Sequence, residues 1–174
     1  MAFPASPLIL LCCSTVVLRA QVARPRFEDF PVTSEWNGPN APIKLISSSE
    51  RMFRTLLGEA SRKPPDFAGH YRFALWGCGS ACAAGALIDL QTGIVFRPPR
   101  SGKQSGWDTW IFCGGFVDGP YVEYRVRSKL VLVRCQGNDP AAQDLSYFVW
   151  EDDHFRPILR LTQKKPAPVG SSRK

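Results

Sequence analysis

Four of the six cysteines carry the most readily interpreted chemistry in this sequence. Cys78 and Cys82 lie close together in a glycine-rich bend, whereas Cys113 and Cys135 enclose a longer loop. In an oxidising compartment an even number of thiols indicates disulfides, and four thiols allow three pairings. We favour Cys78 with Cys82 and Cys113 with Cys135, because the glycines beside Cys78 permit a tight turn. In the chain-entropy model the longer loop contributes about 3 kcal/mol and the shorter about 2 kcal/mol.

Zinc binding and thiol redox catalysis are the alternative uses of these cysteines. Structural zinc sites contain two pairs of closely spaced thiols, and only Cys78 and Cys82 are spaced in that way. A catalytic dithiol has two residues between its cysteines and precedes a helix, whereas Gly79, Ser80 and Ala81 intervene here. The sequence therefore predicts neither a metal nor a cofactor.

His70 offers the main acid–base chemistry, because it is one of only two histidines. Paired with Cys78, it could activate a nucleophile if that thiol stayed reduced. A glycosidase-like pair of carboxylates is the other enzymatic possibility. Its candidates are Asp66, Asp89, Asp108, Asp118 and Glu123.

Turn formation is the simpler use of Asp89 and Asp118. Asp89 opens a predicted hairpin loop and Asp118 precedes Gly119 and Pro120, where aspartate commonly accepts turn hydrogen bonds. The sequence contains no nucleophile elbow, phosphate loop or zinc-protease motif. The pattern therefore favours a non-catalytic role and leaves a small hydrolase using His70 as the alternative.

A basic and aromatic segment follows the predicted hairpin and suggests a binding surface. Arg97 and Arg100 precede Trp107 and Trp110, and tryptophan is a frequent anchor of protein interfaces. Core packing of the two tryptophans and solvation of the basic run remain open as alternatives. The candidate binding residues are His70, Trp76, Asp89, Arg97, Arg100, Trp107 and Trp110.

An apolar run over residues 8–18 predicts export. It is long enough for the core of a signal peptide and too short to cross a bilayer as a helix. We expect residues 1–23 to be a signal peptide that is cleaved near Ala20 or Ala23, removing Cys12 and Cys13. The expected location is periplasmic or secreted, with no transmembrane segment in the mature chain.

Basic residues outnumber acidic ones in the expected mature protein. Only Arg19 of the 22 lysines and arginines precedes residue 24, so 21 remain against 15 acidic residues, a net charge of +6. This surplus suits an anionic surface polymer or an envelope protein as the partner. It is not concentrated as a nucleic-acid footprint would be, so no nucleic-acid partner is expected.

One amphipathic helix is predicted after an extended lead over residues 24–42 and a short strand over 43–46. It opens with the capping-box pattern Ser47 to Glu50 and ends before Pro64. Its apolar stripe, which would pack on a sheet, consists of Met52, Phe53, Leu56, Leu57 and Ala60.

Two-residue alternation replaces the helical pattern after residue 69. It predicts strands at 70–76, 84–90, 94–96, 110–112, 121–126, 129–135, 146–150 and 155–161. Short strands separated by turn residues indicate an antiparallel arrangement. The expected class is α+β, mainly β: a meander of seven or eight strands with one packed N-terminal helix. It forms a single domain over residues 43–162, followed by a disordered basic tail over 163–174.

Six segments, at residues 51–57, 65–71, 76–82, 88–93, 128–133 and 147–150, resemble a family of small, uncharacterised bacterial exported proteins. The shared motif reads Phe-Ala-Gly-His-Tyr at 67–71 and Trp-Gly-Cys-Gly-Ser-x-Cys at 76–82. The resemblance covers most of the chain after Ala41 and implies export and a bacterial origin. It carries over no catalytic residue. The size, the predicted export and disulfides, and the basic and aromatic segment over residues 97–110 lead us to expect a non-catalytic binding or inhibitory module of the cell envelope.

Overall fold

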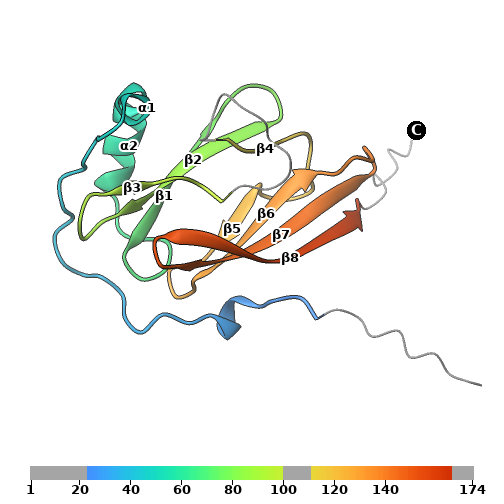
Figure 1. Ribbon diagram of the computed structural model, residues 1–174, viewed down its shortest axis with the longest axis horizontal. Coiled ribbons are helices and arrows are strands. Elements are labelled where there is room, and N and C mark those ends of the chain that lie inside the picture. The colour runs from blue at the N-terminus through green and yellow to red at the C-terminus, as the bar shows by residue number, and fades with distance from the viewer. Residues whose placement is uncertain (1–22, 100–110, 166–174) are drawn as a thin grey trace, which may run out of the picture.

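Two four-stranded antiparallel sheets are the main elements of the protein, in a computed structural model that describes residues 23–99 and 111–165 (Figure 1). The first sheet contains β1 (Tyr71–Gly77), β2 (Cys82–Asp89), β3 (Val95–Phe96) and β4 (Ile111–Gly114). The second contains β5 (Val122–Tyr124), β6 (Leu130–Gln136), β7 (Ala142–Glu151) and β8 (His154–Lys164). This architecture confirms the predicted mainly β class.

The predicted meander is divided between the two sheets. The strands of the second sheet follow one another in chain order, whereas β2 is central in the first sheet, with β1 on one edge and both β3 and β4 on the other. A core of aromatic and branched side chains joins the sheets, and Phe67 and Phe112 within it are fully buried. Burial of such side chains is the main contribution to folding.

The second sheet has buried apolar side chains on both faces. Val131 and Val133 of β6 join the core between the sheets, while Leu132 points to the opposite face, as strand alternation requires. The lead segment covers part of that opposite face with Phe27 and Phe30. Within the lead, Phe27–Asp29 forms a short 3₁₀ helix, η1.

Hydrogen bonds to the turn between β5 and β6 hold the lead segment in place. Ser128 donates its hydroxyl to the Phe27 carbonyl at 2.7 Å. The backbone N–H of Lys129 donates to the Phe30 carbonyl at 2.9 Å. The extended lead of the sequence prediction is therefore a packed part of the fold.

The predicted helix is present but divided into α1 (Ser48–Met52) and α2 (Arg54–Ser61). Its capping box is confirmed, since the Glu50 N–H donates to Ser47 Oγ at 3.2 Å and the Ser47 N–H donates to Glu50 Oε2 at 3.0 Å. The predicted stripe is only partly buried. Leu57 is fully covered, whereas Met52, the last residue of α1 before the interruption at Phe53, is exposed.

Two further expectations are wrong. The short strand expected at 43–46 does not form. In that segment the Lys44 N–H donates to the carbonyl of Gly93, which lies in a loop and not in a strand. Residues 163 and 164, which we expected in a disordered tail, belong to β8, because this strand continues to Lys164 beside Ala142. The rest of the predicted tail after residue 165 lies outside the described residues. Across residues 23–99 and 111–165, none of the helices has the length and apolar character needed to cross a membrane.

Candidate functional site

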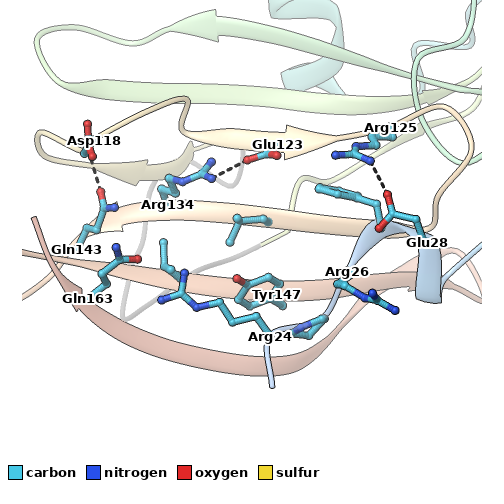
Figure 2. A pocket seen from close by; sticks show the side chains of 14 residues that line it. Arg24, Arg26, Glu28, Asp118, Glu123, Arg125, Arg134, Gln143, Tyr147 and Gln163 are labelled. Atoms are coloured by element: carbon cyan, nitrogen blue, oxygen red, sulfur yellow. Dashed lines mark hydrogen bonds and ion pairs between the residues drawn. The ribbon is translucent and has the colours of Figure 1, made fainter. Parts of the chain in front are cut away.

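A polar cavity of about 490 Å³ lies on the face of the second sheet that the lead segment partly covers (Figure 2). Strand alternation places Leu132 and Arg134 of β6 and Leu145 and Tyr147 of β7 on this face. The lead contributes Arg24 to the opposite side of the cavity. The walls of the cavity are therefore formed jointly by the second sheet and the lead segment.

Four of the charged side chains that line the cavity form two ion pairs. Arg134 Nη2 lies 2.6 Å from Glu123 Oε2, and Arg134 Nη1 donates to the Pro120 carbonyl at 3.1 Å. Arg125 Nη1 pairs with Glu28 Oε1 at 2.6 Å on the side nearest the lead. These pairs fix the walls, because each cation is held beside a carboxylate.

Unpaired hydrogen-bonding groups remain on the cavity side of the second sheet and the lead. Among the described residues, the Arg24 guanidinium and the Tyr147 hydroxyl have no recorded hydrogen-bond partner. Gln143 Oε1 accepts from the Asp118 N–H at 2.8 Å, which leaves the Gln143 amide nitrogen as a donor. Figure 2 shows the Arg24 side chain extended from the lead over the sheet.

This arrangement suits recognition of a ligand that accepts hydrogen bonds. A guanidinium, a phenol and a carboxamide can together bind a carboxylate, a phosphate or sugar hydroxyls. Within the described part of the chain, no group of three or more histidine, cysteine, aspartate or glutamate side chains is placed to hold a metal ion.

Among the predicted binding residues, the fold brings His70 and Asp89 together. His70 Nε2 lies 3.8 Å from Asp89 Oδ1, and burial lowers the pKa of His70, with Asp89 and Asp153 only partly opposing the effect. Asp89 also accepts from the Gln91 N–H at 2.8 Å and from the Thr92 hydroxyl at 2.7 Å. Asp89 thus has the turn role that the sequence suggested.

The other predicted binding residues do not join this pair. Trp76 packs on Phe53 with a ring-centroid distance of 4.8 Å, on the face of the first sheet that the helices cover. Arg97 Nη2 lies 3.4 Å from the Ser49 hydroxyl. Arg100, Trp107 and Trp110 lie outside the described residues. The predicted binding surface is therefore not one site in the described chain.

Two of the candidate carboxylates, Asp118 and Glu123, line the polar cavity, whereas Asp66 and Asp89 lie elsewhere. Asp66 pairs with Arg72 at 3.2 Å, and Glu123 is committed to Arg134 in the second sheet. Asp118 is bonded to Gln143 through its backbone N–H and not through its carboxylate. Asp108 lies outside the described residues.

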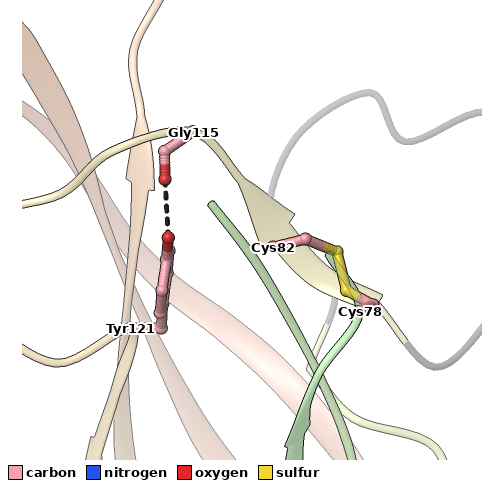
Figure 3. Close-up of a disulfide and its surroundings, with 4 residues drawn as sticks. All are labelled: Cys78, Cys82, Gly115 and Tyr121. Carbon is pink, nitrogen blue, oxygen red and sulfur yellow. Dashed lines mark hydrogen bonds between the residues drawn. A yellow bond between two sulfur atoms is a disulfide. The ribbon is translucent and has the colours of Figure 1, made fainter. Parts of the chain in front are cut away.

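The disulfide between Cys78 and Cys82 is present at the end of β1 (Figure 3). His70 precedes the other end of this strand, about 25 Å away at the usual rise per residue, so the fold separates His70 from Cys78. Cys135 is buried, with its sulfur 3.9 Å from the Phe112 carbonyl oxygen. The side chain of Cys113 is outside the described part, and its pairing with Cys135 stays a prediction.

Sequence reasoning missed the cavity because its residues belong to distant segments. The available signal was polar residues at alternating positions of otherwise apolar strands, namely Arg134 in β6 and Gln143 in β7. Arg24 carried no such signal, since only tertiary packing places the lead on the sheet. Comparisons with protein-family models, with curated proteins and with solved structures found no match for this chain.

Proposed function

We propose that this protein is a non-catalytic binding module of the bacterial cell envelope, and that the cavity between the lead and the second sheet binds an anionic surface polymer. The observation that carries this proposal is the Arg24 guanidinium, which lies at the cavity without a recorded partner among the described residues. An exported chain with a net positive charge would meet such polymers directly.

The size and chemistry of the cavity support the proposal. A volume of about 490 Å³ lies within the range of ligand sites in proteins. Tyr147 and Leu145 offer an apolar floor, while Arg24 and the Gln143 amide offer donors to an acidic group. A charged repeat unit of a polymer could therefore be held by one cavity while the chain continues into solvent.

Titration calorimetry with three polymers tests the proposal. Polygalacturonate presents carboxylates, polyphosphate presents phosphates, and dextran presents only hydroxyls. We expect saturable binding of at least one acidic polymer, which Arg24→Gln weakens about tenfold because one charged hydrogen bond is lost. The matched control, Arg54→Gln on exposed α2, should leave the affinity unchanged.

Equal affinities for dextran and the acidic polymers would contradict the proposal. Equal losses in the Arg24 and Arg54 variants would also contradict it, because the effect would then reflect overall charge. The two acidic polymers distinguish a carboxylate ligand from a phosphate ligand.

A small hydrolase that uses His70 with a carboxylate is the second candidate, and the proximity of His70 to Asp89 favours it. The turn hydrogen bonds of Asp89 restrict its movement towards a substrate. A panel of ester, peptide and glycoside substrates tests this function. Hydrolysis that disappears in His70→Ala supports it, and hydrolysis that persists, or none at all, excludes it.

A further inference from the structure

The outer edge of β1 is covered over its first half and open over its second. The Tyr71 N–H donates to the Phe67 carbonyl at 3.0 Å, and the Phe73 N–H donates to Asp66 Oδ1 at 2.9 Å. Alternation directs the backbone groups of Leu75 and Gly77 to the same outer side. In the described part of the chain these groups have no recorded hydrogen-bond partner.

Three other outer strands, β3, β5 and β8, carry features that hinder pairing with a further strand. β8 contains Pro157 and several cationic residues, and β3 is two residues long and leads into Pro98. β5 is three residues long and follows Pro120. Proline, charge and shortness are the usual means of protecting a sheet edge. β1 is seven residues long, and its segment Leu75 to Gly77 contains neither a proline nor a charged side chain.

Space for a partner adjoins this open edge. A cavity of about 350 Å³ is lined by Leu75, Gly77, Ala83 and Tyr121 together with other apolar residues, and no charged side chain lines it. Leu75 is 46% exposed although it is a large apolar residue. An extended chain that pairs with β1 would place one of its side chains in this cavity, since alternate residues of a strand face the same side.

The charged residues near this cavity indicate which kind of side chain the partner would carry next to its apolar one. A neighbouring cavity of about 310 Å³ shares Leu75 with the first and is lined by two cations, Lys63 and Arg72, and one carboxylate, Glu59. We infer that the open half of β1 binds an extended segment of a partner protein by strand addition, with an apolar side chain in the first cavity and an acidic one near Lys63. Backbone hydrogen bonds would supply affinity and the two cavities specificity.

Selection of short random peptides displayed on phage, with the full chain as the target, tests this inference. We expect enriched peptides that combine an aromatic or branched side chain with an acidic one. Their binding should protect the Leu75 and Gly77 N–H groups from hydrogen exchange. N-methylation of the peptide amides should weaken binding at least about tenfold, because the ladder hydrogen bonds are lost.

Gly77→Lys is the informative variant, because a Cβ at Gly77 meets no atom within 4 Å. It adds a protecting charge to the edge without a clash and should abolish peptide binding. Gly58→Lys is the matched control, since its Cβ also has open space and it lies on α2. Failure to enrich any peptide, or equal binding by both variants, would overturn the inference. A dimer that Gly77→Lys dissociates would assign the edge to a second copy and overturn the proposed occupant.

Discussion

At the residue scale, Gly69 explains why part of the Phe-Ala-Gly-His-Tyr motif is structural. Its N–H donates to the Val126 carbonyl at 2.7 Å, and its carbonyl accepts from the Trp36 N–H at 2.8 Å. It therefore joins the start of β1 to both the lead and the segment after β5. Its φ of +85° belongs to the left-handed region, and a Cβ there would lie 2.4 Å from the Ser34 carbonyl oxygen.

Gly69→Ala should destabilise the protein by at least about 2 kcal/mol, because the strained φ and the backbone contact act together. Gly77→Ala is the control, since no atom lies within 4 Å of its Cβ and its φ is not in the left-handed region. Urea unfolding of both variants measures the difference. Equal midpoints would show that the junction can rearrange around an alanine.

Asp144 is a buried carboxylate that links β7 to β8. Arg160 Nη2 lies 2.6 Å from Oδ2, and the Thr162 hydroxyl donates to Oδ1 at 2.7 Å. Burial acts to raise the pKa of Asp144, but the bonds from Thr162 and Arg160 outweigh it and lower the pKa below its ordinary value. Because the folded-state pKa is depressed, this group stabilises the fold above the pKa of the unfolded chain. That stability is lost as the pH falls through the folded-state pKa.

Thr162→Val should therefore reduce the free energy of unfolding by about 2 kcal/mol near neutral pH, since a charged hydrogen bond is lost. The difference between the variant and the original protein should shrink as the pH falls below the ordinary range for aspartate. Chemical unfolding at several pH values measures this dependence. A pH-independent difference would attribute the loss to packing instead.

At the element scale, local patterns identified the strands and the helix start, because alternation and capping depend on neighbouring residues. The strand predicted at 84–90 overlaps β2, and the predicted capping box is formed by Ser47 and Glu50. The interruption of the helix at Phe53 was not predictable. Phe53 packs on Trp76 of β1, a contact between residues distant in the sequence.

Ser47→Ala tests the contribution of the cap to α1. The substitution should cost about 1 kcal/mol, because Ser47 Oγ accepts the Glu50 N–H at the first turn. Ser48→Ala, at the next and exposed position, should cost less, since no hydrogen bond of its side chain is recorded among the described residues. Thermal unfolding followed by circular dichroism distinguishes the two.

At the scale of the whole molecule, the division into two sheets and the packing of the lead were beyond sequence reasoning. Both depend on which apolar faces meet, and the alternation in β6 allows Val131 or Leu132 to face the core equally well. The cavity has the same origin, because Arg24 reaches Tyr147 only after the lead has packed. Of the candidate residues named from the sequence that the structure describes, Asp118 and Glu123 line this cavity and the others do not.

Thiol titration of the denatured, unreduced protein tests the predicted second disulfide. Starting from Arg24, the chain contains Cys78, Cys82, Cys113 and Cys135. We expect no reactive sulfhydryl if both bridges form, and reduction should then cost a few kcal/mol, about 3 kcal/mol of it from the longer loop. Detection of two sulfhydryls would leave only the bridge between Cys78 and Cys82 and would contradict the Cys113–Cys135 pairing.

The position of Arg24 in the cavity wall has a practical consequence for recombinant production. An affinity tag joined directly ahead of this residue would extend from the rim beside Gln163 and Tyr147 and obstruct entry. Preparations labelled in that way should therefore give falsely weak ligand titrations until a protease cuts the fusion.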